Sequence, residues 1–146
     1  MSNNSHFDYI IIGNGLAGLQ LALKLATDAY FNDKQIALID PSTKSINDKT
    51  WSFWEIGNSS WDNIIHKSWT RASIITSEKT IDLKLNPYRY KTVHSIDFYN
   101  LAKSRLRKHN NIHFVIDNVI SINEEDLIKV ETKKHSYFAK HVFDSR

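Results

Sequence analysis

The sequence predicts an α/β fold of the Rossmann-like kind, with a parallel central sheet, an inserted excursion and an antiparallel β-meander. Three observations support this prediction. An apolar run at residues 9–12 leads into the glycine-rich residues 13–18, an amphipathic segment over 16–29 follows, and a second apolar run ends at Asp40. A G-x-G-x-x-G pattern alone occurs often by chance, but a strand before it and a helix after it indicate a nucleotide site.

Each glycine of the turn has its own expected role. Gly13 allows the tight turn, Gly15 lets phosphate oxygens approach the backbone without meeting a Cβ, and Gly18 lets the helix lie close to the sheet. The helix begins at Leu16 and Ala17, and its unpaired amides and the positive end of its dipole attract negative charge. The turn is therefore expected to hold the pyrophosphate of a dinucleotide.

A second buried strand is expected over residues 35–39, with Asp40 at its C-terminal end. An acidic residue about 20 positions past the glycines can accept hydrogen bonds from a ribose hydroxyl. It would also repel a 2′-phosphate, which disfavours NADP. The alternative is that Asp40 only caps a turn formed with Pro41 and Ser42.

Residues 41–93 depart from this pattern, because they contain polar turns, four tryptophans and short alternating stretches in place of a helix and a parallel strand. We expect an inserted excursion there. Residues 71–76 and 80–85 alternate apolar and polar side chains and predict a small antiparallel hairpin. Ser95 is then expected to cap a helix that ends near His109.

The last part of the chain predicts short strands. Residues 112–116 form one strand, with 119–122 as its continuation, and 127–132 and 137–142 form further strands of a meander at the sheet edge. The last strand returns to the central sheet. Its C-terminal end would therefore reach the nucleotide crevice.

Composition excludes several functions. The 146 residues suit one globular domain, and no apolar run is long enough to cross a bilayer. Without cysteine there is no disulfide, thiolate nucleophile or cysteine zinc site, and the histidines show no metal-binding spacing, so no metal is expected. The polar N-terminus leaves no room for a cleaved signal, so we expect a cytoplasmic protein, or a peripheral one at the inner face of the membrane.

The net charge of +3 gives little support for a nucleic-acid partner. The basic cluster at residues 103–108 lies on an amphipathic segment, where a solvated helix face is the common explanation. No helix-turn-helix, RNP-like or zinc pattern accompanies it. We expect no nucleic-acid partner, and a transient contact with anionic lipid headgroups fits the cluster better.

Several segments together resemble the opening of the bacterial lycopene cyclase family. Residues 8–18 and 38–41 match it in order, and so do the closing residues 142–146. The most specific part is residues 47–55, Asn-Asp-Lys-Thr-Trp-Ser-Phe-Trp-Glu. The resemblance spans nearly the whole chain but covers only the first part of the family, whose members are considerably longer.

The resemblance implies a flavoprotein that binds FAD and uses the reduced flavin without net redox change. Its substrate would be lycopene, a linear C40 carotenoid whose ends are closed into rings, so the reaction is an isomerisation. Gly13, Gly15 and Gly18 carry over as pyrophosphate contacts and Asp40 as the ribose contact. The backbone of Val119 carries over as the adenine contact.

The same resemblance suggests that Trp51 and Trp54 line the flavin or polyene region. The alternative is that these aromatic side chains supply a private core for the excursion, since large rings compensate for few other apolar residues. Asp48 and Glu55 flank the aromatic residues. A solvated loop or a helix cap explains these two acids better than proton donation does.

No catalytic residue is assigned, because the family's acidic catalytic motif and the segment that closes over the flavin lie beyond Arg146. The chain is expected to be a truncated, N-terminal portion of a cyclase that is inactive alone. Two alternatives stay open. One is a fragment of another FAD-dependent monooxygenase or dehydrogenase, against which only residues 47–55 argue, and the other is a non-catalytic nucleotide-binding module.

Overall fold

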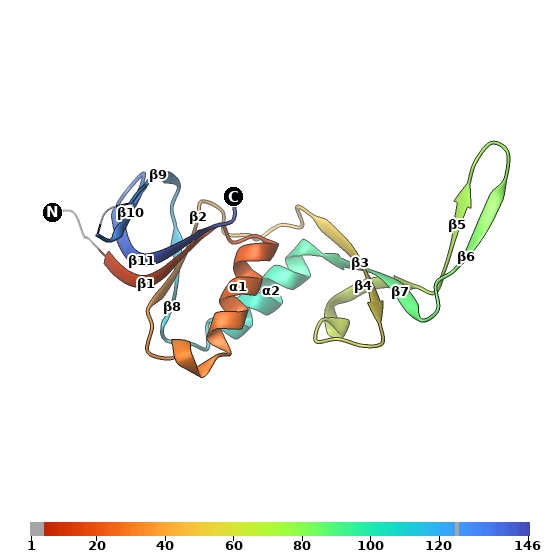
Figure 1. Ribbon diagram of the computed structural model, residues 1–146, viewed down its shortest axis with the longest axis horizontal. Helices are drawn as coiled ribbons and strands as arrows, with labels where there is room; N and C mark the ends of the chain where they lie inside the picture. Colours follow the sequence, from red (N-terminus) through yellow and green to blue (C-terminus); the bar gives the residue numbers. More distant parts are fainter. Residues whose placement is uncertain (1–4, 125) are drawn as a thin grey trace. The chain divides into compact units, whose positions relative to one another are not determined.

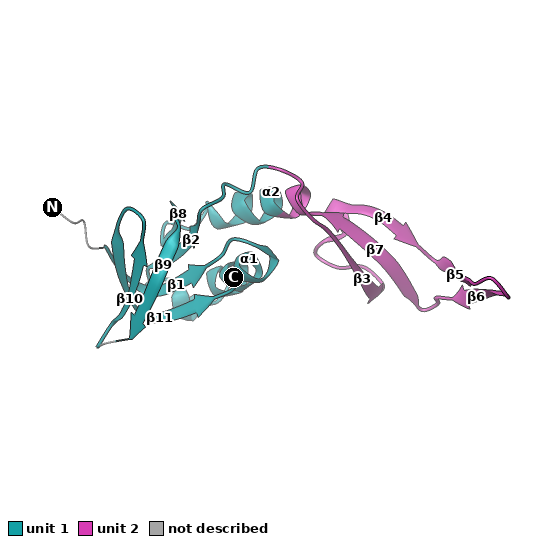
Figure 2. Cartoon of the chain, turned by 90° about the horizontal axis from the view of Figure 1, so that it is seen from above, with its two compact units in different colours: residues 1–45, 99–146 teal, residues 46–98 magenta. Residues whose placement is uncertain are grey.

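The computed structural model describes residues 5–124 and 126–146 (Figure 1). Its elements in chain order are β1 (Ser5–Ile12), α1 (Leu16–Ala26), η1 (Ala29–Phe31), β2 (Ile36–Asp40), β3 (Thr50–Ile56), η2 (Asp62–Ile64), β4 (Ile65–Trp69), β5 (Arg71–Ile75), β6 (Thr80–Lys84), β7 (Tyr88–His94), α2 (Ser95–Leu106), β8 (Ile112–Ile116), β9 (Val119–Glu124), β10 (Ile128–Thr132) and β11 (Ser136–Asp144). They form two compact units, residues 1–45 with 99–146, and residues 46–98 (Figure 2). The expected excursion at 41–93 largely coincides with the second unit.

Among the described residues, the first unit contains a six-stranded sheet with the order β8-β2-β1-β11-β10-β9. The strands from β8 to β11 run parallel, and β10 and β9 continue the sheet antiparallel. Ile10 of β1 pairs with Ala37 of β2 on one side and with Val142 of β11 on the other. All five residues of β2 are buried, as expected for a parallel strand with both faces covered.

The two faces of this sheet are covered by different elements (Figure 1). On one face α1 packs its buried stripe, which includes Gly18, Leu19 and Ala22, and the backbone at Gly18 lies close to Ile11 of β1. On the opposite face, the meander contributes to a core cluster of Ile10, Ile12, Ala37, Ile39, Val119, Val130, Tyr137 and Ala139. The alternation of β1 explains this division, because successive side chains of a strand point to opposite faces.

The second unit, which the structure describes throughout, is an antiparallel structure. Three strands pair in the order β3-β7-β4, and β5 pairs with β6 as a separate hairpin. The predicted hairpin is thus present. The three-stranded sheet was not predicted from the sequence. Exposure alternates along residues 50–56, as is typical of a strand with one covered face.

One strand lies elsewhere than the sequence predicts. β9 does not continue β8, since β8 is the parallel edge strand beside β2 and β9 is the antiparallel edge strand at the other side of the sheet. Asp117 redirects the chain between them. Its amide donates to the Asp40 carbonyl, and its carboxylate accepts the Thr132 hydroxyl and the Asn118 amide.

The predicted helices begin at the expected residues but differ in detail. α1 ends at Ala26, three residues before its predicted end. The Ser95 hydroxyl donates to the Asp48 carboxylate (2.8 Å) and accepts the Lys49 amide (3.0 Å), which ties the first residue of α2 to the segment before β3. The Asn47 side-chain oxygen also approaches the amide of Ile96, at 3.5 Å. The polar residues before β3 therefore anchor the start of α2.

Candidate functional site

A cavity of about 320 Å³ lies at the carboxyl ends of β1, β2 and β11. This is the edge of a parallel sheet where open α/β folds bind their ligands, and β2 and β11 lie there on either side of β1. The cavity is lined by Ile12, Gly13, Gly15, Ile39, Asp40, Pro41, Ser42, Lys44, Asn118, Val119, Ser145 and Arg146. The structure therefore brings the glycine turn, the acid of β2 and Val119 to one hollow.

The three glycines of the turn have different surroundings. Gly13 has a φ of +96°, and a Cβ there would lie 2.7 Å from the Ser145 hydroxyl oxygen. A Cβ on Gly18 would lie 1.9 Å from the Gly13 carbonyl oxygen, so the start of α1 can approach the turn only without a side chain. A Cβ on Gly15 would meet nothing within 4 Å. Gly15 is thus free of packing constraints and faces open space at the cavity.

The start of α1 supplies polar groups with no side-chain cap. Gly15 is the N-cap residue, makes no side-chain hydrogen bond, and no acidic residue occupies the first turn. Leu16 and Ala17 are the first residues of the helix, so their amides have no carbonyl partner within it. A helix N-terminus of this kind attracts an anion through its amides and its dipole.

Asp40 joins the turn to the end of β2. One carboxylate oxygen accepts the Asn14 amide at 2.7 Å and the other accepts the Ser42 amide at 2.7 Å, and the residue is only 6% exposed. The turn-capping interpretation is therefore realised through Ser42. It does not exclude a ligand, because each carboxylate oxygen can accept more than one hydrogen bond and Asp40 also lines the cavity.

Lys44 brings a cation to the same acid. Its Nζ lies 3.4 Å from the Asp40 carboxylate, and its backbone has a positive φ of 49°. Lys103 of α2 holds this loop in place by donating to the carbonyls of Thr43 (2.6 Å) and Lys44 (2.8 Å). Burial lowers the pKa of Lys103. One residue of the basic cluster thus has a structural role beside the cavity.

The end of β11 closes the third side of the cavity, as the sequence predicts. The Ser145 hydroxyl donates to the Ile12 carbonyl at 2.8 Å, which fixes β11 beside the glycine turn. Arg146 forms a hydrogen-bonded ion pair with Asp144 at 2.7 Å and donates to the carbonyl of Val119 at 3.4 Å. This ion pair holds the pKa of Asp144 below its usual value.

The structure separates the two tryptophans that the sequence places together. Trp51 and Trp54 are three residues apart on β3, so their side chains lie on opposite faces of the three-stranded sheet. Trp51 packs edge-on against the buried ring of Phe98, with ring centroids 5.5 Å apart. Trp54 is 53% exposed. The private-core interpretation therefore describes Trp51 but not Trp54.

The acids beside these tryptophans have structural partners. Asp48 accepts the Ser95 hydroxyl, as described above, and Glu55 accepts a hydrogen bond from the buried ammonium of Lys91 at 2.7 Å. Asp62 is a second acceptor of Lys91, also at 2.7 Å. Asp48 therefore anchors a loop to the start of α2, and Glu55 belongs to an ion-pair network around the buried ammonium of Lys91.

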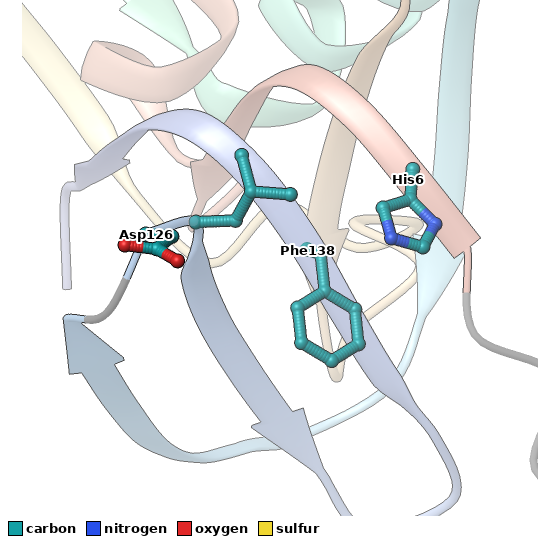
Figure 3. A pocket seen from close by; sticks show the side chains of 4 residues that line it. His6, Asp126 and Phe138 are labelled. Carbon is teal, nitrogen blue, oxygen red and sulfur yellow. The ribbon is translucent and has the colours of Figure 1, made fainter.

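A second, wider hollow of about 490 Å³ lies near the opposite end of β1, and its lining includes His6, Asp126, Leu127 and Phe138 (Figure 3). The rings of His6 and Phe138 stack with their centroids 5.2 Å apart. This hollow contains none of the site residues that the sequence predicts. Its described lining offers no set of polar groups that would select a ligand.

Several residues at the first cavity were not predicted from the sequence, namely Lys44, Asn118, Ser145 and Arg146. Ser145 and Arg146 belong to the segment that resembles the family, so the resemblance was the available signal. Lys44 had no comparable signal, because it reaches Asp40 through an irregular turn rather than through a helical or strand period.

No group of three or more His, Cys, Asp or Glu side chains could hold a metal ion among residues 5–124 and 126–146. In the same residues, no helix has the length and apolar character needed to cross a membrane.

The fold is shared with flavin-dependent enzymes of known structure. The chain is similar to p-nitrophenol 4-monooxygenase PnpA from Pseudomonas putida DLL-E4, with a TM-score of 0.74, 15% identity, and coverage of 97% of this chain and 41% of that one. It is similar to the flavin-dependent brominase Bmp2, with a TM-score of 0.64, 15% identity, and coverage of 96% and 38%. At these identities the likeness shows the fold alone.

A thioredoxin reductase from Gloeobacter violaceus also matches, with a TM-score of 0.54, 13% identity, and coverage of 96% of this chain and 34% of that one. The chain thus spans about two fifths or less of the length of these three proteins. No curated protein matches the sequence. The model of the family described as lycopene cyclase protein matches residues 8–146, and the chain therefore belongs to the lycopene cyclase family.

Proposed function

We propose that the cavity at the carboxyl ends of β1, β2 and β11 binds the adenosine diphosphate half of FAD. The observation that supports this most directly is the open space at Gly15, beside the uncapped start of α1. A turn that packing alone required would surround each glycine with neighbouring atoms, as happens at Gly18. The pyrophosphate would accept the free amides of Leu16 and Ala17.

The remaining lining residues suit the rest of the nucleotide. Asp40 would accept a ribose hydroxyl with the lone pairs that Asn14 and Ser42 leave free. The backbone of Val119 would lie along the adenine ring. Lys44 places a cation at the rim of the cavity, where it would offset part of the negative charge of the pyrophosphate.

For the whole protein we propose the reaction of its family, in which the ends of a linear carotenoid close into rings without net redox change. When bound, a reduced flavin supplies an electron-rich surface near developing positive charge. The residues of this chain contribute the binding of the cofactor, and none of them is assigned a catalytic step. A carotenoid dissolves in lipid, so we also propose a peripheral contact with the membrane surface.

The test is a titration of the purified chain with FAD, followed by flavin fluorescence. Binding should saturate at one FAD per chain, and Gly15→Val should weaken it by about a hundredfold or more, because a branched side chain fills the space of the phosphate. Circular dichroism should show that the variant is folded, since its side chain meets open space. No saturable binding by the folded wild-type chain, or equal binding by the variant, would overturn the proposal.

A further inference from the structure

The loop after β2, residues 41–45, brings an ammonium group to the cavity through a backbone that lysine rarely adopts. Lys44 has a φ of +49°, in the left-handed region of backbone space. Its amide donates to the Ser42 hydroxyl at 3.1 Å, and its Nζ lies 3.4 Å from the Asp40 carboxylate. A short loop with such a residue needs contacts from elsewhere in the fold to keep one conformation.

Lys103 of α2 supplies these contacts from a distant part of the chain. Its Nζ donates to the Thr43 carbonyl at 2.6 Å and to the Lys44 carbonyl at 2.8 Å. These carbonyls belong to the two peptide groups on either side of the Lys44 Cα. Because each peptide group is planar, one ammonium that holds both of them also fixes the φ and ψ of Lys44.

The position of Lys103 is costly for a cation. Burial lowers the pKa of Lys103, and the like charges of Arg107 and Lys44 lower it further. The two acceptors of Lys103 are neutral carbonyls, which do not neutralise its charge as a carboxylate would. An anion bound in the neighbouring cavity would offset this positive charge.

We propose that Lys103 is a positioning residue of the nucleotide site, which holds the Lys44 ammonium where it attracts the pyrophosphate. This inference rests on the proposed function, because it concerns the cavity assigned there to the adenosine diphosphate half of FAD. Lys44 lines that cavity, whereas Lys103 is not among the described residues that line it. Lys103 therefore acts through Lys44, and the basic cluster at residues 103–108 serves an anion site through one of its members.

A purely structural role for Lys103 makes a different prediction. The loop that it holds also contains Ser42, whose amide donates to the Asp40 carboxylate. If Lys103 only shaped the loop, its loss would disturb Asp40 and weaken every ligand that uses the ribose acceptor. If Lys103 places a charge, its loss weakens ligands in proportion to their phosphate charge.

The first experiment is a double-mutant cycle on the FAD affinity of the 146-residue chain, measured by flavin fluorescence at low ionic strength. Lys44→Met and Lys103→Met should each lower the affinity about three- to tenfold. The double variant should lose no more than about twofold beyond either single variant, because both changes remove the same placed charge. Lys103→Arg keeps donors for both carbonyls and should stay within about twofold of wild type.

A matched control removes a charge from the same segment without touching the loop. Lys108 is exposed two residues beyond the end of α2, so Lys108→Met should change FAD affinity by less than about twofold. Circular dichroism should show that all variants are folded. The melting temperature of Lys103→Met should stay within about 3 °C of wild type, since water can reach the carbonyl of the exposed Thr43.

The second experiment compares ADP with adenosine by titration calorimetry. Lys103→Met should weaken ADP about three- to tenfold and adenosine by less than about twofold, because adenosine carries no phosphate. The effect on ADP should shrink in about 1 M salt. Equal losses for ADP and adenosine, or additive losses of FAD affinity in the double-mutant cycle, would overturn the inference.

Titration of the same variants with inorganic pyrophosphate separates failure of this inference from failure of the proposed function. FAD binding that is unchanged in Lys103→Met removes the role of Lys103 and leaves the cofactor site. Pyrophosphate binding that depends on Lys44 and Lys103, in a chain that does not bind FAD, removes the cofactor assignment and keeps the role of Lys103. A folded wild-type chain that binds neither FAD nor pyrophosphate overturns both.

Discussion

The backbone amide of Asn14 donates to the Asp40 carboxylate across 2.7 Å, and this hydrogen bond joins the middle of the glycine turn to the end of β2. The pair is buried, and the second carboxylate oxygen accepts the Ser42 amide. The turn that would hold a pyrophosphate and the acid that would hold a ribose are therefore fixed relative to one another before a ligand arrives. Preorganisation of this kind reduces the ordering cost of binding.

Replacement of Asp40 by asparagine tests the hydrogen bond between the glycine turn and the end of β2. In Asp40→Asn, the NH₂ group faces a backbone N–H where a carboxylate oxygen accepted it before. An unsatisfied buried donor costs about 1–3 kcal/mol of unfolding free energy. We also expect FAD affinity to fall about tenfold, since the ribose acceptor is weakened. Urea unfolding and flavin titration measure the two effects, and Asp33→Asn, at an exposed acid of the same unit, is the matched control.

Substitution of Gly18 by alanine should destabilise the fold, whereas the same substitution at Gly15 should have little effect on stability. Gly18→Ala places a Cβ 1.9 Å from the Gly13 carbonyl oxygen, so the turn or the helix must move. We expect the unfolding free energy to fall by about 2 kcal/mol or more. Gly15→Ala places its Cβ in open space, and its unfolding free energy should stay within about 1 kcal/mol of wild type. A destabilised Gly15→Ala beside an unaffected Gly18→Ala would contradict the geometry.

The cation at the rim of the cavity should contribute to nucleotide affinity in a salt-dependent way. Lys44→Met removes the ammonium beside Asp40 and keeps most of the side-chain volume. FAD affinity should fall about three- to tenfold at low ionic strength, and the difference should shrink in about 1 M salt, where screening is strong. Lys34→Met, at a lysine paired with Asp33, is the control. A loss that is equal at all salt concentrations would show that Lys44 acts only through the shape of the loop.

The ion-pair network of the second unit should make stability depend on acid pH. The hydrogen bond from Lys91 holds the pKa of Asp62 below its ordinary value of 3.8. A carboxyl whose folded pKa is lowered contributes stability above its unfolded pKa, and this contribution is lost as pH falls through the folded pKa. Lys91→Met should therefore lower the melting temperature by several degrees at pH 6.

The difference between wild type and Lys91→Met should then shrink as the pH falls below the ordinary pKa of 3.8 and towards the lowered pKa of folded Asp62. Thermal unfolding followed by circular dichroism between pH 3 and 7 measures it. Lys140→Met is the control, because Lys140 pairs with Asp8 at an exposed position and should contribute less. A difference that is constant over this pH range would contradict the assignment of the pair.

The glycine turn and Asp40 could be predicted because they depend on local order along the chain. A strand, a turn, a helix and a second strand follow one another within residues 5–40, and parallel pairing then brings the ends of β1 and β2 together. The return of β11 to the central sheet could also be predicted. Its pairing with β1 places Ser145 and Arg146 at the cavity.

The placement of Trp51 and Trp54 on opposite faces of one strand could not be predicted, because residues 50–56 were not recognised as a strand. Residues three apart on a strand point to opposite faces, so one face of this sheet presents only one of the two rings. The prediction that residues 119–122 continue the strand of residues 112–116 failed for another reason. Two residues between them, Asp117 and Asn118, send the chain from one edge of the sheet to the other, and no period of apolar residues records such a change.

The sequence by itself determined the nucleotide-type turn, the acid that follows it and the membership of a family, because each depends on residues that are near neighbours along the chain. Only the tertiary structure decided that Lys44 meets Asp40 and that Trp54, Tyr90 and Trp69 form one row. The physical reason is strand register. Side chains from distant strands become neighbours through backbone hydrogen bonds between those strands, and these bonds leave no spacing pattern in the sequence.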